Sequence, residues 1–390
     1  MNSWINSNLG NHVDLLTGYP FKSEQYTDNA SDIRLLRGDN IAQGKLRWEN
    51  AKKWPSSLAQ GLEKYHLKRG DLVIAMDRTW IKAGLKIAPI TEPDTPCLLV
   101  QRVARLRAKN DLDSYFLYLL LRSHKFEQYV KGVQTETAVP HISALQIQQY
   151  PITLPPLEEQ TAIADLLSTW DAAIEKTEKL IAAKEKRYLW LLSCLISDKS
   201  YPRRLIRDFA TEVSTRNRDK VTGQVLSVTN HSGFVLPEDQ FERRVASSDL
   251  SNYKIVRRGQ YAYNPSRINV GSIARLDDWN EGVLSPMYVV FELDEKKVDT
   301  DFFLHWLSSH ESKQRIKKSA QGSVRETVSF GDFAAIPFPL PPQKEQQAIA
   351  RTLNIAQHEI TLMEELVDAY RQQKHGLMQK LLTGQWWVKS

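Results

Sequence analysis

Residues 151–164 read PITLPPLEEQTAIA, and residues 337–350 read PFPLPPQKEQQAIA. Nine of the fourteen positions are identical at a constant offset of 186 residues, so the chain contains an internal repeat. In each copy two consecutive prolines end an extended segment, because proline fixes its own φ and keeps the preceding residue out of the α region. Glutamates follow at once, where the positive end of a helix favours negative charge. Both copies therefore predict the start of a helix.

A hydrophobic seam follows each copy. Taking every third and fourth residue alternately gives a heptad a/d pattern that continues for about forty residues. Helices of that length would extend about 60 Å. The polar interruptions are Thr177, Lys184 and Lys374. The apolar seam residues are Ile163, Leu167, Trp170, Ile174, Ile181, Tyr188, Leu191 and Leu195 in the first helix, and Ile349, Leu353, Ala356, Ile360, Met363, Val367, Tyr370, Leu377 and Leu381 in the second.

Neither seam can remain exposed to water, and the simplest way to bury both is one against the other. Each helix follows its own large globular region, so an antiparallel pair would hold those regions at opposite ends. The alternative is two separate amphipathic core helices, and the matched register of the two seams favours the paired arrangement.

The repeat extends backwards into the globular regions. YHLKRGDLVIAM at 65–76 parallels YKIVRRGQYAYN at 253–264, each with a basic turn, a glycine and a strand. We expect an α+β fold in which two α/β globules are joined by two long helices that form an antiparallel coiled coil, related by a pseudo-twofold internal repeat. The expected parts are a first globule at 1–155, a long helix at 156–199, a second globule at 200–341, and a second long helix with a C-terminal tail at 342–390.

Composition is that of a soluble globular protein, with 42% hydrophobic and 25% charged residues. No apolar run approaches the ~18 residues that a membrane span needs, and the N-terminus does not resemble an export signal, so we expect a cytoplasmic protein. The two cysteines, Cys97 and Cys194, are far apart and are expected to be buried packing residues. The net charge is +6, and residues 61–110 carry ten basic against five acidic residues, which favours a nucleic-acid partner.

Motifs for catalysis are absent from the sequence. There is no P-loop and no G-x-G-x-x-G fingerprint. Asn264-Pro265-Ser266-Arg267 lacks the second proline and the aromatic residue of an aminomethyltransferase turn. The paired carboxylates Asp277-Asp278 and Asp294-Glu295 are typical of turns rather than of a metal-dependent nuclease site. We therefore expect no catalytic residue and no metal site in this chain.

Taken together, these features resemble the specificity subunit of type I restriction–modification systems. The resemblance rests on the duplicated LPP-x-x-EQ-x-AIA segments at 154–164 and 340–350, on LLTGYPFKS and LKRGDLVIAM, and on the closing GLMQKLLTG at 376–384. It spans nearly the whole chain. The tail departs from it, because Trp386-Trp387 stands where basic or small residues are expected, which leaves open whether the tail packs on the first globule or meets a partner.

The resemblance implies that each globule reads one half of a bipartite double-stranded DNA target and that the helices set the spacing. It implies partners as well: two modification subunits, which bind S-adenosylmethionine, and restriction subunits, which consume ATP with Mg²⁺. No cofactor is expected in this chain and no membrane association. Leu166, Leu180 and Leu189 lie beside the first seam and would seat partner helices, or else widen the contact between the two long helices.

Candidate DNA-contacting residues lie in the loops after the repeated strands. Arginine and lysine can pair with guanine, asparagine and glutamine with adenine, and other basic side chains hold phosphates without reading sequence. The alternative for each is a solvated surface charge, and Trp80 is either a core residue or a wedge. The predicted residues are Arg78, Lys82, Lys86, Gln134 and Thr135 in the first globule, and Arg267, Asn269 and Arg325 in the second.

Two other classes of function stay open on the sequence alone. One is a methyltransferase or nuclease whose site has no recognisable motif, which binding of a methyl donor to the isolated chain would reveal. The other is a coiled-coil adaptor that binds only proteins, which would have no salt-dependent affinity for DNA.

Overall fold

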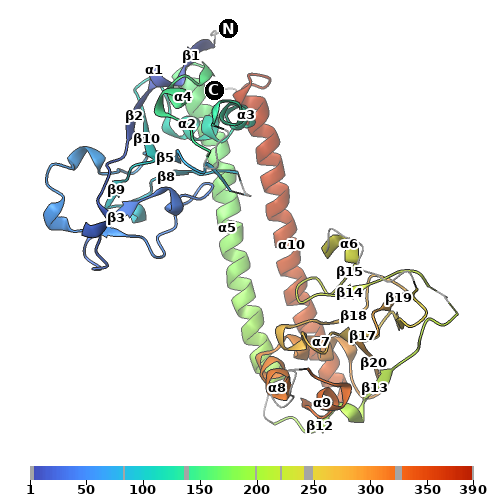
Figure 1. The fold of residues 1–390 in the computed structure, drawn as a ribbon. Coiled ribbons are helices and arrows are strands. Elements are labelled where there is room, and N and C mark those ends of the chain that lie inside the picture. The colour runs from blue at the N-terminus through green and yellow to red at the C-terminus, as the bar shows by residue number, and fades with distance from the viewer. Residues whose placement is uncertain are drawn as a thin grey trace. The chain divides into compact units, whose positions relative to one another are not determined.

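The computed structural model describes residues 4–81, 84–135, 140–197, 200–219, 222–240, 249–320 and 327–388. The chain divides into two compact units. Unit 1 consists of Met1–Lys176 together with Val367–Ser390, and unit 2 is Thr177–Leu366. Each unit therefore combines one globular region with one half of each long helix, and the elements of both can be followed in Figure 1.

The two long helices are α5 (Leu157–Ile196) and α10 (Gln343–Leu382), each of 40 residues. Each begins just after its pair of prolines, as predicted. All the predicted seam positions are buried or half-buried, whereas Leu166, Leu180 and Leu189 beside the seam are exposed. The heptad pattern thus identified the buried stripe of both helices correctly.

The seams pack against each other within each unit. In unit 1 the end of α10, at Leu381, shares a core with the start of α5, at Ile163. In unit 2 the end of α5, at Leu192, shares a core with the start of α10, at Leu353. The two helices therefore run antiparallel, and the predicted alternative of two separate core helices is wrong.

Polar seam residues have partners on the other helix. In unit 1 the buried Lys374 ammonium lies 2.5 Å from the Asp171 carboxylate, which also accepts a hydrogen bond from the Tyr115 hydroxyl. Burial lowers the pKa of Lys374, and burial together with Asp171 raises the pKa of Tyr115. In unit 2, Lys184 donates to Glu359 at 2.8 Å. Two of the polar interruptions of the heptad pattern, Lys184 and Lys374, thus make specific contacts between the helices.

The globular part of unit 1 is built in layers. A four-stranded antiparallel sheet, in the order β2-β10-β5-β8, separates two cores. Ile74 faces the core beneath the helices, and Val73 faces the core shared with a second sheet, β4-β3-β9. The strands are β1 (Ile5–Asn8), β2 (Val13–Thr17), β3 (Ile33–Leu36), β4 (Lys53–Trp54), β5 (Leu72–Ala75), β6 (Trp80–Ile81), β7 (Gly84–Leu85), β8 (Ile87–Pro89), β9 (Cys97–Leu99), β10 (Val103–Ala108) and β11 (Pro151–Leu154); the helices are α1 (Leu9–His12), α2 (Ser114–Leu121), α3 (His124–Val133) and α4 (Ala144–Gln148).

Unit 2 repeats this plan. Its four-stranded sheet has the order β13-β20-β17-β18, with Tyr261 and Tyr263 facing the helices and Ala262 facing the opposite core. The strands are β12 (Arg203–Leu205), β13 (Ala210–Val213), β14 (Ser227–Val228), β15 (Phe234–Val235), β16 (Lys254–Arg257), β17 (Tyr261–Tyr263), β18 (Ile273–Arg275), β19 (Glu281–Leu284), β20 (Val289–Leu293) and β21 (Pro337–Pro339); the helices are α6 (Pro237–Gln240), α7 (Thr300–Ser308), α8 (His310–Ala320) and α9 (Phe330–Ala334).

One glutamine ties each long helix to its globule. The Gln160 side chain, 1% exposed, accepts from the Asp113 N–H and donates to the Asp111 and Pro155 carbonyls. Gln346, also 1% exposed, repeats these bonds 186 residues later, with Asp299, Lys297 and Pro341 as partners.

The aspartates in these contacts are the N-caps of the helices that follow the sheets. Asp113 accepts from backbone N–H groups of α2, and Asp299 does the same for α7. The glutamine therefore fixes where a long helix starts relative to the first helix of the globule. Gln160 and Gln346 are the glutamines of the repeated LPP-x-x-EQ-x-AIA segments. The sequence repeat by itself did not reveal that they join the long helices to the globules.

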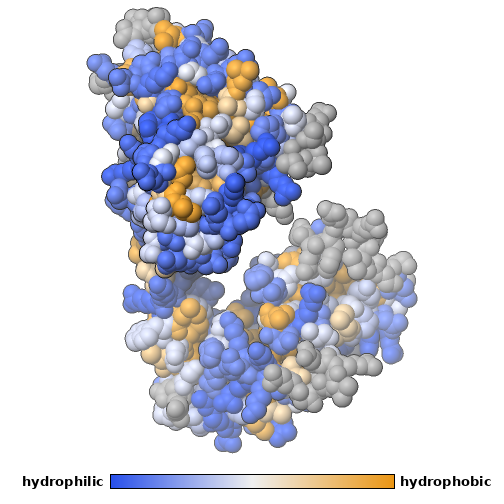
Figure 2. Space-filling view, turned by 60° about the vertical axis from the view of Figure 1, so that its left-hand side comes forward, coloured by the Kyte–Doolittle hydropathy of each residue, from blue (hydrophilic) through white to orange (hydrophobic). Residues whose placement is uncertain are grey.

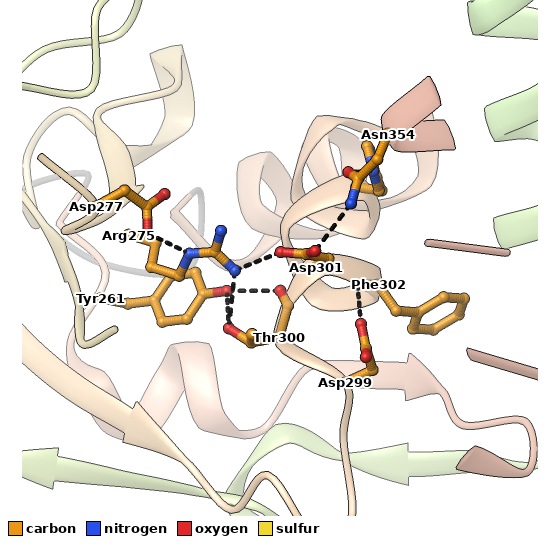
Figure 3. A network of polar contacts seen from close by, with 9 residues as sticks. Tyr261, Arg275, Asp277, Asp299, Thr300, Asp301, Phe302 and Asn354 are labelled. Carbon is orange, nitrogen blue, oxygen red and sulfur yellow. Dashed lines mark hydrogen bonds and ion pairs between the residues drawn. The ribbon is translucent and has the colours of Figure 1, made fainter. Parts of the chain in front are cut away.

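Unit 2 contains a polar network between its sheet and its helices (Figure 3). Arg275 on β18 bonds Asp277 and, on α7, Asp301. Asp301 in turn accepts from Asn354 on α10 at 2.8 Å. His305 completes the link, because its ring contacts both Asn354 and Tyr188, which lie on the two long helices. Burial lowers the pKa of His305.

The C-terminal tail packs on unit 1. Val388 contacts the main core of that unit, and the Lys380 ammonium lies 4.0 Å from the centre of the Trp386 ring. Trp386 and Trp387 remain half or more exposed. The tail thus contacts the first globule through Val388, while both tryptophans keep an accessible surface.

The expectation for the cysteines was half right. Cys97 on β9 is fully buried, but Cys194 on α5 is exposed. Cys194 was expected to be buried on composition alone, yet it lies outside the a/d seam, so the helix turns it to solvent. Across the described residues, no helix is long and apolar enough to span a membrane, and no cluster of three or more His, Cys, Asp or Glu side chains is placed to hold a metal ion.

Replacing Gln346 by Ala is expected to destabilise unit 2 by about 2 to 4 kcal/mol, because it removes the bonds to one buried N–H and two carbonyls. The matched control is Gln347→Ala, since Gln347 is exposed on the next position of the same helix. Denaturant unfolding of the full chain, followed by circular dichroism, measures both. Equal effects of the two substitutions would contradict the assigned role.

Unit 2 is expected to lose stability as the pH falls below 6.5, the ordinary pKa of histidine. Because the pKa of His305 is lowered in the folded state, the unfolded chain binds the proton more readily, so acidification favours unfolding. The His305→Gln variant is expected to show a smaller loss between pH 7.5 and 5.5 in the same unfolding assay. An identical pH dependence in both proteins would refute this.

Candidate nucleic-acid interface

A basic cleft of about 820 Å³ opens in unit 1 beside the ends of strands from its two larger sheets. Residues around β3 and β4 form one wall, and the loops beside β5, β8 and β10 form the other. Clefts lined by one sign of charge focus the electrostatic field and attract ligands of the opposite sign. The charged lining residues are Arg37, Lys52, Arg78, Lys86 and Arg102, with Asp39 and Asp77.

Two of the predicted residues lie in this cleft. Arg78 is exposed and Lys86 is half-buried, and neither forms an ion pair with any residue that the structure describes. The Arg78 backbone donates to the Pro140 carbonyl at 2.9 Å and has a φ of +47°. The predicted Lys82 lies outside the described residues. Arg78 and Lys86 are thus cations available to an anionic ligand.

Sequence reasoning missed the other three cations of the cleft. Arg37 and Lys52 come from the N-terminal segment, where no repeat was visible, and Arg102 comes from the turn before β10. The signal that could have found Arg102 is its position directly before the repeated strand β10. The start of β10 pairs with the end of β5, and Arg78 follows that end of β5. Nothing in the local pattern marks Arg37 or Lys52.

Gln134 and Thr135 lie at the end of α3 and do not line the cleft. The Gln134 side-chain oxygen accepts from the Thr79 hydroxyl and from the Trp80 indole N–H at 3.4 and 3.3 Å. Thr135 forms backbone and side-chain bonds with His141. Trp80 is half-buried against the core of unit 1, with the Lys131 ammonium 4.9 Å from the centre of its ring, so it contributes to packing.

In unit 2 the predicted residues lie in the loop after β17. Asn269 is exposed and lines a cleft of about 470 Å³ together with Lys313 and Lys317 of α8. Arg267 is exposed as the N-cap of the short 3-10 helix Ile268–Val270. The predicted Arg325 lies outside the described residues. Asn269 and the two lysines form a second candidate surface.

Backbone hydrogen bonds show which residues of the two units correspond. Ile142 donates to the Met76 carbonyl in unit 1, and Val328, 186 residues after Ile142, donates to the Pro265 carbonyl in unit 2. Met76 therefore corresponds to Pro265. Arg78 and Arg267 each lie two residues after these carbonyls, so they correspond to each other. The two predicted arginines therefore occupy equivalent positions in the repeat.

The surroundings of these equivalent arginines differ. Next to Pro265, unit 2 has a cleft of about 530 Å³ whose described lining includes Glu212, Ser266 and Met287, and no lysine or arginine. Unit 1 has its basic cleft at the corresponding place. The shared framework thus presents different chemistry in the two units.

The side of unit 1 turned forward in Figure 2 is mostly hydrophilic, with hydrophobic residues in separate patches.

One family profile matches most of the chain. It is the type I restriction modification DNA specificity domain, which aligns with residues 17–185 and 259–368. The two matched segments lie in the two halves of the repeat and include the basic cleft of unit 1. The chain belongs to this family.

Individual relatives agree with the family. The chain is 37% identical over 178 residues to the type I restriction enzyme EcoAI specificity subunit of Escherichia coli, which is 45% of this chain and 29% of that protein. It is 32% identical over 197 residues to the MjaVIII specificity subunit of Methanocaldococcus jannaschii, which is 50% of this chain and 46% of that protein. The chain thus matches less than half the length of these two relatives.

Among solved structures, the type I restriction–modification S subunit from M. genitalium has the same fold. The TM-score is 0.60 at 14% identity, and the superposition covers 99% of this chain and 96% of that one. This likeness concerns the fold, in which mixed globules combine with two long helices.

Replacing both Arg78 and Lys86 by Ala is expected to weaken DNA binding by tenfold or more at moderate salt, because unpaired cations in a cleft contribute through phosphate contacts. The slope of log affinity against log salt should become shallower by about two. Lys109→Ala is the matched control, since Lys109 is an exposed cation at the opposite end of β10. Fluorescence anisotropy with duplex DNA measures each variant. An equal loss for the control would place the binding surface elsewhere.

Proposed function

We propose that this protein is the DNA specificity subunit of a type I restriction–modification complex and has no catalytic role of its own. One observation carries the proposal. The chain contains one framework twice, with the same sheet order and the same buried glutamine, yet with different loops and charges around the equivalent arginines. A duplicated scaffold with divergent surfaces suits one task performed on two different DNA sequences.

In this proposal residues 1–155 and 200–341 are the two target recognition domains, and each reads one half of a bipartite double-stranded site. Base edges in the major groove would be read by side chains from loops, while other cations hold phosphates. The segments 156–199 and 342–390 are the spacer helices and tail. Two helices paired along their seams set the distance between the half-sites.

The partners follow from the same proposal. Two modification subunits would bind S-adenosylmethionine and methylate adenine, and restriction subunits would use ATP and Mg²⁺. Apolar side chains outside the seam support docking of the modification subunits along the long helices. These exposed residues are Leu166, Leu180, Leu189 and Trp190 on α5, and Ile355, Leu362 and Leu366 on α10.

Methylation mapping of genomic DNA, in cells that carry this protein and its modification subunit, tests the proposal. The expected result is a site with two specific segments and a fixed nonspecific spacer. Inserting a pattern-preserving heptad after Lys179 and another after Glu365 should lengthen both helices by about 10 Å. The spacer should then grow by about three base pairs, at ~3.4 Å per pair.

Exchanging residues 1–155 for those of a relative is the companion variant, and it should change one half-site and leave the spacer unchanged. A contiguous site in the parent protein would contradict bipartite reading. A heptad insertion that changed the half-site sequences, or that left the spacer length unchanged in an active complex, would contradict the role of the helices.

A further inference from the structure

Two backbone outliers mark the basic cleft of unit 1. Among the described residues, three non-glycine residues have a positive φ, and two of them, Arg78 at +47° and Arg102 at +68°, line this cleft. Such conformations are uncommon for residues with a side chain and persist only where the surrounding structure holds them. Here the Arg78 N–H bonds Pro140, and the Arg102 carbonyl accepts from Met76. The backbone thus fixes where both arginine side chains begin.

The two arginines differ in their side-chain partners. The Arg102 Nε lies 3.6 Å from the Asp77 carboxylate, and Asp77 is itself held by the His141 ring at 2.5 Å. Arg102 is nevertheless 63% exposed. The ion pair at Nε leaves the two terminal amino groups outside the contact with Asp77, and the carboxylate favours orientations of the guanidinium that keep Nε turned toward it. Arg78 has no such partner within the part of the chain that the structure describes.

This difference separates two kinds of contact with DNA. A carboxylate beside Arg102 offsets much of its charge, which weakens attraction to a phosphate but leaves a planar pair of donors in a defined orientation. Guanine presents two acceptors, O6 and N7, that match such a pair. Arg78 and Lys86 keep their full charge, which suits contacts to the phosphate backbone.

Resting on the proposed function, we infer that Arg102 reads a guanine in the half-site bound by unit 1, and that Asp77 is the residue that positions it. Unit 2 has no counterpart to this pair. Ala104 of β10 pairs with Ile74, and Val289 of β20 pairs with the equivalent residue Tyr263, so Ala104 corresponds to Val289. Arg102 therefore corresponds to Met287, which is 53% exposed, and Asp77 corresponds to Ser266. The guanine contact belongs to one half-site only.

Selection from a random-sequence duplex pool tests this, with the full-length chain alone and together with its modification subunits. In the Arg102→Ala variant, discrimination at one guanine of one half-site should fall by roughly ten- to a hundredfold, because alanine has no donor for the guanine O6 and N7 atoms. All other positions should keep their sequence. The second half-site therefore serves as an internal control for folding.

The Asp77→Asn variant distinguishes the positioning of Arg102 by Asp77 from the effect of the Asp77 charge on overall affinity for DNA. It should weaken selection at the same guanine while leaving overall affinity unchanged or higher, since a negative charge is removed from the cleft. Arg78→Gln is the matched control, and it should lower affinity for every sequence and make the salt slope shallower by about one without changing the selected site.

The inference is overturned if Arg102→Ala selects the same sequence as the parent chain, or if the position that it relaxes is not a guanine. It is also overturned if Arg78→Gln changes that position as strongly. A parent chain that selects no sequence at all would instead refute the proposed function, and this result is distinct from the other three.

Discussion

The structure depends on one buried glutamine in each unit. Gln160 and Gln346 sit at the start of the long helices and bond to the backbone just before α2 and α7. A buried amide that lost these partners would leave several polar groups without hydrogen bonds, at a cost of about 1–3 kcal/mol for each. The direction in which each long helix leaves its globule is thereby fixed to the first helix of that globule. Other contacts in the two units can vary around this shared joint.

Around that joint, the two units differ in their polar contacts to the long helices. In unit 1, Tyr115 of α2 shares the Asp171 carboxylate with Lys374. In unit 2, Asp301 and His305 of α7 contact Asn354, and Tyr188 completes the set. Tyr188 and Lys374 occupy equivalent places in the repeat, yet Tyr188 contacts the His305 ring and Lys374 contacts the Asp171 carboxylate. These contacts distinguish the two helix halves, although their apolar seams are alike.

The surfaces proposed to bind DNA also combine a shared framework with different side chains in the two units. The framework positions Arg78 and Arg267 equivalently, but the clefts beside them have different charge. Loops can diverge in this way because they contribute little to the cores, which are filled by alternate residues of the sheets. Recognition chemistry is thus free to change without loss of the fold.

Much of the architecture was predictable because it depends on local rules. The prolines before Leu157 and Gln343, the heptad seams and the repeated basic turns at Gly70 and Gly259 are short-range signals, and the structure confirms each. Cys194 was placed wrongly because its environment depends on which side of α5 it occupies. The role of Gln160 was also missed, since a single polar letter does not show what it will contact.

The amino-acid sequence by itself determined the duplication, the two long helices, their buried stripes and the class of fold, because periodicity and proline act over a few residues. Only the tertiary structure decided which cations share a cleft. Arg37, Lys52, Arg78, Lys86 and Arg102 come from separate segments of the chain and meet beside the ends of strands from two sheets of unit 1. It also decided that Arg102 lies within ion-pair distance of Asp77 while Arg78 stays unpaired among the described residues. Such pairings arise from strand order and from the turns between strands, and no local pattern specifies them.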